Sequence, residues 1–190
     1  MSTNYMYLVQ WYGPFSSRNE LKRWEDAQKE SFFLYLFQGK RKNKRSFRYY
    51  CGMTYYRKNS NASVAVRMGD SNHHIHSFEK ERPETISIWI GKIANMDHPH
   101  QNDVRLCENM ITSEMAQIEI DSINVENETN KLAPNQNTYI INEWYGQNGI
   151  EYRPKSRDYI SNRIPDVISY YAPTKSLYRA KKLVYYGNLQ

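Results

Sequence analysis

The chain has 190 residues, enough for one domain with a sizeable core. Its 26 Lys and Arg against 20 Asp and Glu give a formal net charge of +6, which suits a polyanionic partner without requiring one. No apolar run approaches the roughly 18 residues that span a bilayer, and the N-terminus lacks the pattern of a signal peptide. Because Cys51 and Cys107 lie in apolar runs without CxxC spacing, we expect buried thiols in a soluble, cytoplasmic protein with no membrane partner.

The first thirty residues predict a strand followed by a helix. Residues 5–12 are rich in strand-forming residues, and Gly13 and Pro14 are predicted to end the strand. A serine followed three residues later by a glutamate is a capping box, so a helix is expected over 17–29.

A hairpin is predicted next, with strands at 32–37 and 47–51. Its turn is strongly cationic, and each strand carries a tyrosine that we expect on the same face of the sheet. The cations of this basic turn are candidate phosphate-binding residues: Lys40, Arg41, Lys42, Lys44 and Arg45.

The middle of the chain alternates helix and strand patterns. A short helix is expected to end near Met68, with Gly69 as its stop, and residues 71–84 resemble a loop. Residues 86–93 alternate apolar and polar side chains as a strand does, whereas apolar residues recur at helical spacing over 102–119.

The remainder of the chain predicts a polar loop at 121–137, strands at 138–145 and 164–171 separated by a turn at 146–149, and a basic helix at 176–186. The whole order indicates an α/β (α+β) fold: a small mixed or antiparallel sheet flanked by helices, with an α/β extension at the C-terminus.

Several short motifs occur in an order typical of one nuclease family. FLY (33–35) precedes YCG (50–52), Arg67 follows on the next helix, and after the alternating strand the helical run RLCENMI (105–111) carries Glu108. This order resembles the GIY-YIG nuclease domain, and the closest members in size are small restriction-type enzymes. The resemblance covers residues 31–127.

The resemblance implies a division of the chain into three parts. Residues 1–30 would form an N-terminal strand–helix extension, residues 31–127 the GIY-YIG-like core, and residues 128–190 a C-terminal extension packed on that core.

The resemblance also implies a role for each site residue. Glu108 would bind Mg²⁺ or another hard divalent cation such as Mn²⁺, which prefers oxygen ligands and retains several waters. Arg67 would bind the scissile phosphate with its planar guanidinium group. Of Tyr35 and Tyr50, one would act as the general base while the other orients water or phosphate, and His74 would contact the phosphate or the leaving group.

Some assignments stay open at this stage. Arg57 competes with Arg67, and His73 competes with His74. The HHIH run (73–76) also suggests zinc, but no cysteine or carboxylate is spaced to complete a tetrahedral set.

The sequence therefore predicts a metal-dependent endonuclease that hydrolyses phosphodiester bonds in double-stranded DNA. A homodimer is expected on the same resemblance, because cutting both strands takes two sites. Two alternatives remain. One is a catalytically inactive nucleic-acid-binding module, favoured by Phe33 in place of the first glycine of the motif, and the other is a structural protein whose tyrosines serve packing.

Overall fold

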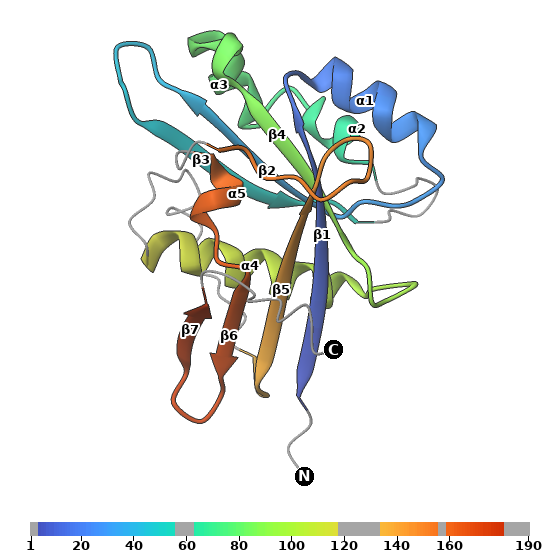
Figure 1. Cartoon of the computed structure of the whole chain (residues 1–190), viewed down its shortest axis with the longest axis vertical. Helices are drawn as coiled ribbons and strands as arrows, with labels where there is room; N and C mark the ends of the chain where they lie inside the picture. The colour runs from blue at the N-terminus through green and yellow to red at the C-terminus, as the bar shows by residue number, and fades with distance from the viewer. Residues whose placement is uncertain (1–3, 56–62, 118–133, 156–158, 181–190) are drawn as a thin grey trace, which may run out of the picture.

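The computed structural model describes residues 4–55, 63–117, 134–155 and 159–180. Their centre is a seven-stranded sheet in the order β3-β2-β4-β1-β5-β6-β7 (Figure 1). All neighbouring strands are antiparallel except β1 and β5, which are parallel. The strands are β1 (Tyr5–Phe15), β2 (Leu34–Lys40), β3 (Phe47–Met53), β4 (Ser87–Ile93), β5 (Thr138–Tyr145), β6 (Val167–Tyr171) and β7 (Ser176–Ala180).

Helices cover both faces of this sheet, so the expected mixed α+β fold is confirmed, with a larger sheet than predicted. The helices are α1 (Arg18–Ala27), α2 (Val64–Met68), α3 (Ile75–Glu81), α4 (Gln101–Gln117) and α5 (Ile160–Arg163), with a 3₁₀ turn η1 (Pro83–Thr85). None of the described helices is long and apolar enough to cross a membrane.

Alternation along the strands divides the core between the two faces. Leu34 and Leu36 of β2 point to the face covered by α4, whereas Tyr35 and Phe37 point to the face covered by α1, α2 and α3. Cys107 lies on the α4 side, where it is buried without a disulfide.

The hairpin register places the two motif tyrosines together. Tyr35 pairs with Gly52 and Phe37 pairs with Tyr50, so Tyr35 and Tyr50 are diagonal neighbours on one face. Their ring centroids are 6.0 Å apart, which confirms the prediction that the two tyrosines share a face.

Strand β1 lies inside the sheet rather than beside it. It pairs with β4 on one side and with β5 on the other, and Trp11 stacks on Trp144 with ring centroids 5.6 Å apart. The buried Trp11 indole also donates a hydrogen bond to Asn142 Oδ1 at 2.9 Å. The expected divisions 1–30, 31–127 and 128–190 therefore contribute strands to one continuous sheet.

The N-terminal helix begins as predicted, while its preceding strand extends further. The Ser17 hydroxyl accepts from the Glu20 backbone N–H at 3.2 Å, as a helix cap does. Strand β1 continues to Phe15 instead of ending at Gly13-Pro14, because the ladder with β4 shifts register between Tyr12 and Phe15 and so accommodates a proline.

Two predicted elements are wrong. The expected loop 71–84 contains α3 and η1, since the buried side chains of Ile75 and Phe78 lie one helical turn apart. The expected helix 176–186 is strand β7 over its described part, paired with β6 through a turn that holds Lys175 at a φ of 53°. Residues 181–186 lie outside the described residues.

Candidate active site

A pocket of about 520 Å³ opens where the second motif tyrosine meets the segment that follows α2. Four of the sequence-predicted candidates line it, together with polar residues of that segment. The lining is Tyr50, Arg67, Asp70, Ser71, Asn72, His73 and His74.

Tyr35 lies directly behind this lining. Gly52, its partner on β3, explains how the ring fits: a Cβ atom at position 52 would lie only 2.4 Å from the Tyr35 hydroxyl and ring. Because glycine has no side chain, the phenol crosses over the outermost strand of the sheet. The glycine of the YCG motif therefore makes the space in which Tyr35 packs.

His73 connects Tyr35 to the pocket and has a fixed tautomer. The Ile75 backbone N–H donates to His73 Nδ1 at 3.2 Å, so the proton of the neutral ring is on Nε2. Burial lowers the pKa of His73 to about 4, which keeps the ring neutral near pH 7. His73 Nε2–H therefore donates to the Tyr35 oxygen, 2.9 Å away.

The two tyrosines differ in their access to the pocket. Tyr35 is 1% exposed, and burial, reinforced by Tyr50, raises its pKa far above the ordinary value. Tyr50 is 8% exposed and lines the pocket, and burial followed by the charge of Glu108 raises its pKa to about 12. Of the two, Tyr50 is the phenol that a bound molecule would meet.

His74 and the histidine two residues later take different positions. The exposed His74 ring lies 4.9 Å from the Tyr50 ring, centroid to centroid. His76 instead holds the loop in place: Nε2 lies 2.9 Å from the Asp70 carbonyl oxygen and Nδ1 lies 3.1 Å from a Glu79 carboxylate oxygen.

Arg67 projects from α2 to the pocket and forms an ion pair with Asp70. Both side chains are about half exposed, 42% and 53%, so a stronger anion has access to the guanidinium group. Sequence reasoning did not identify Asp70, although an acid three residues after an arginine at a helix end is a recognisable signal. The rival Arg57 lies outside the described residues.

Glu108 approaches from the opposite side of the sheet. Helix α4 packs beside β3, which is the strand at one edge of the sheet. The charge of Glu108 acts on Cys51, which faces α4, and also on Tyr35 and Tyr50, which lie on the opposite face of the sheet. Burial raises the pKa of the Glu108 carboxyl to about 7, and Arg105 and Arg67 partly oppose this shift. Glu108 therefore lies near enough for its charge to act on the two tyrosines and for the Arg67 charge to act on it, but it does not line the pocket.

The surroundings of Glu108 are compatible with a hard divalent cation. Within the described part of the chain, no hydrogen bond or ion pair engages its carboxylate. The described residues contain no cluster of three or more metal-ligating side chains. A single carboxylate is nevertheless a typical protein contribution to Mg²⁺, which takes its other ligands from water and phosphate.

The basic turn lies at the far end of the hairpin. Lys40 is five residues from Tyr35 along β2, which corresponds to about 17 Å, and no residue of the turn lines the pocket. The Lys40 ammonium group sits 4.8 Å from the Phe47 ring centroid, and the Lys42 backbone N–H donates to Glu81 at 3.2 Å. Three cations of the turn are exposed: Lys42, Lys44 and Arg45.

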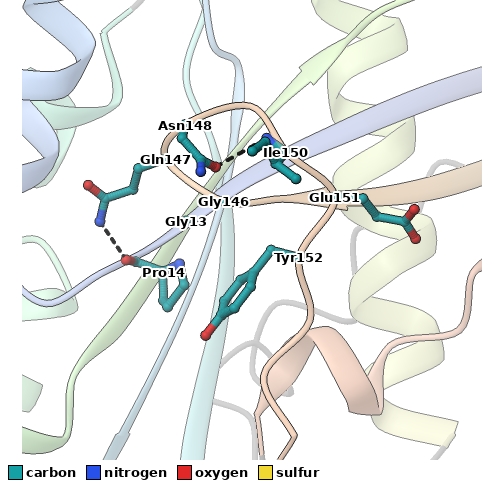
Figure 2. A pocket seen from close by; sticks show the side chains of 8 residues that line it. All are labelled: Gly13, Pro14, Gly146, Gln147, Asn148, Ile150, Glu151 and Tyr152. Atoms are coloured by element: carbon teal, nitrogen blue, oxygen red, sulfur yellow. Dashed lines mark hydrogen bonds between the residues drawn. The ribbon is translucent and has the colours of Figure 1, made fainter.

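A second hollow, of about 540 Å³, lies between the end of β1 and the turn after β5 (Figure 2). It contains none of the predicted site residues. Two of its polar side chains bond to neighbouring protein groups: Gln147 donates to the Pro14 carbonyl oxygen and Asn148 accepts from the Ile150 N–H. We therefore take the Tyr50 pocket as the candidate active site.

Comparison of the chain with models of protein families, with characterised proteins and with solved structures gave no match.

Proposed function

We propose that this protein is a divalent-cation-dependent endonuclease that hydrolyses phosphodiester bonds in double-stranded DNA. The observation that carries the proposal is the grouping of Tyr50, Arg67 and His73 around one pocket, with Tyr35 behind it and Glu108 near enough for its charge to act on Tyr50. Phosphodiester hydrolysis needs an activated water, stabilisation of charge on the phosphate and help for the leaving oxygen. This grouping offers one chemical group for each need.

Arg67 supplies positive charge to the phosphate. Its guanidinium group exchanges the Asp70 carboxylate for phosphate oxygens, which it can bind through two parallel N–H donors. The exposure of the Arg67–Asp70 pair keeps the cost of this exchange small, because exposed ion pairs contribute about 1 kcal/mol or less.

Tyr50 is the phenol assigned as the general base for the attacking water, and Tyr35 orients the Tyr50 side chain. The assignment follows from access, since Tyr50 lines the pocket and its pKa is raised less than that of Tyr35. Loss of the Tyr50 proton is favoured by the nearby arginine, and Tyr35 also lowers the Tyr50 pKa through a hydrogen bond between the two side chains. His73 holds Tyr35 for this task through its Nε2–H.

Glu108 is the residue assigned to Mg²⁺ or Mn²⁺. A bound divalent cation polarises the phosphate and stabilises the leaving oxygen. Before it can bind the cation, the Glu108 carboxyl must lose a proton whose pKa is about 7, so the protein is expected to favour neutral to alkaline pH. His74, which is exposed beside Tyr50 and lines the pocket, is the residue assigned to donate a proton to the leaving oxygen.

The basic turn is assigned to a distant part of the same DNA. Its separation of about 17 Å from Tyr35 along the strand corresponds to about five phosphates of one DNA strand, which are spaced 3.4 Å along the axis. The turn would therefore hold the duplex while the scissile phosphate enters the pocket.

Plasmid relaxation in Mg²⁺ or Mn²⁺ tests the proposal. We expect nicking or cutting by the wild type and a loss of at least about a hundredfold in Arg67→Ala and Glu108→Gln. Asp26→Asn, which removes an exposed carboxylate from α1, is the control and should cleave like the wild type.

Two other outcomes have defined meanings. Salt-dependent DNA binding without cleavage under any divalent cation would select the inactive binding module. No salt-dependent DNA binding at all would refute both nucleic-acid functions.

A further inference from the structure

We propose that Glu25 of α1 is a positioning residue that holds α2 in place and thereby orients Arg67 at the pocket. The inference rests on the proposed function for the significance of Arg67, while the structural coupling between Glu25 and α2 can be tested on its own.

The carboxylate of Glu25 binds the beginning of α2 at three points. Oε1 accepts from the Val64 backbone N–H at 2.8 Å, and Oε2 accepts from the Ala65 N–H at 2.9 Å and from the Ser63 hydroxyl at 3.0 Å. Glu25 is 8% exposed, so these bonds are largely shielded from water. Ser63 Oγ in turn accepts from the Val66 N–H at 3.2 Å. A side chain from a different helix thus satisfies the first free amides of α2.

Helix α2 depends on such contacts because it has only five residues. Isolated helices shorter than about 12 residues are marginal in water, so external contacts must fix this one. Val64 and Met68 are buried one turn apart and anchor one side of α2. Arg67 lies on the exposed part, so the direction of its side chain follows the orientation of the whole helix.

The same helix α1 also binds the other end of α2. Arg18 donates to the Met68 carbonyl oxygen at 3.3 Å and to the Glu79 carboxylate at 2.6 Å. Glu79 also contacts His76, which bonds the Asp70 carbonyl oxygen. Helix α1 therefore holds α2 at both termini and reaches the loop that lines the pocket.

Helix α1 is itself attached to the sheet, so it can serve as a fixed reference. Leu21 is fully buried, and the Trp24 indole N–H donates to the Gln147 carbonyl oxygen at 2.7 Å. The Gln147 side chain donates to Glu20 at 2.8 Å and to the Pro14 carbonyl oxygen at 2.8 Å, the latter bond being visible in Figure 2. The position of Arg67 is thereby tied to residues that lie outside the region of the nuclease resemblance.

Glu25→Gln tests the coupling with little change of shape. The carboxamide turns an N–H group toward one of the two backbone amides, so one donor loses its acceptor. We expect the single-turnover cleavage rate to fall by about tenfold to a hundredfold, while DNA affinity changes by less than about threefold. Asp26→Asn, on the exposed side of α1, is the matched control and should leave both quantities unchanged.

A double-mutant cycle separates positioning from general stability. If Glu25 acts through Arg67, Glu25→Gln adds no further loss of rate in an Arg67→Ala background. Multiplicative losses would overturn the proposal. If Glu25→Gln fails to fold, the same cycle can be measured with Ser63→Ala, which removes the Ser63 bond to Glu25 together with the cap bond to the Val66 N–H.

Hydrogen exchange gives a readout that does not require cleavage. Glu25→Gln should speed exchange at the amides of Val64 and Ala65 at least tenfold more than in α4. If the wild type does not cleave DNA but Glu25→Gln still shows this local increase in exchange, the proposed function is refuted and the coupling between Glu25 and α2 is retained. Equal changes throughout the protein, or none, would overturn the coupling itself.

Discussion

Glu108→Gln should stabilise the folded protein at alkaline pH while abolishing cleavage. Burial raises the pKa of this carboxyl from an ordinary value of 4.5 to about 7 in the folded protein. Between these two values the unfolded chain releases the proton while the folded protein keeps it. The wild type therefore loses stability as the pH rises through this interval, and glutamine, which has no charge, does not.

The size of the effect follows from the shift. Each pKa unit corresponds to 1.36 kcal/mol, so the whole shift corresponds to about 3 kcal/mol in the free energy of unfolding above pH 8. For a chain of 190 residues this is an increase of about 6–12 °C in Tm for the variant relative to the wild type.

Urea unfolding in EDTA at pH 4.5, 6 and 8.5 measures the effect. The difference between Glu108→Gln and the wild type should grow steadily from the lowest to the highest pH. Mg²⁺ at ten times its dissociation constant should then stabilise the wild type by about 1.4 kcal/mol at pH 8.5 and leave the variant unchanged. A difference that does not vary with pH, or that declines as the pH rises, would refute the reasoning.

Three further predictions concern other parts of the molecule. Gly52→Ala should destabilise the protein by about 1–3 kcal/mol and reduce cleavage, because the added methyl group would displace Tyr35; thermal melting and plasmid relaxation measure the two effects. Asn142→Ala should lower the free energy of unfolding by about 3 kcal/mol in urea, since it leaves the Trp11 indole and a backbone carbonyl unpaired in the core. Replacing the three exposed cations of the basic turn with serine should reduce the slope of log affinity for DNA against log salt by about 3, and an unchanged slope would exclude the turn from the interface.

The elements that the sequence predicted best are those with strong periodicity. Strand alternation placed the side chains of Tyr35 and Tyr50 on one face, and helical spacing located α4 with Cys107 and Ile111 in the core. The order of the motifs led us to expect Tyr50, Arg67 and His74 or His73 near one another, and all four of these residues line one pocket.

The missed features depend on contacts between distant segments. Helix α3 has only Ile75 and Phe78 as apolar anchors, too few for a convincing period. The local propensity of residues 176–180 predicts a helix. The segment is strand β7 instead, because pairing with β6 and the ion pair between Arg179 and the buried Glu114 override that propensity. The position of β1 inside the sheet could not be predicted, because its parallel partner β5 is distant in the sequence.

The parallel pairing of β1 with β5 has a consequence for biosynthesis. Gln10 and Glu143 bond across a separation of 133 residues, so β1 leaves the ribosome long before its partner exists. At 5–20 residues per second the delay is on the order of ten seconds. During that time a strand carrying Tyr7, Val9 and Trp11 lacks β5 as a neighbour, so its apolar side chains and free edge favour aggregation of the nascent chain.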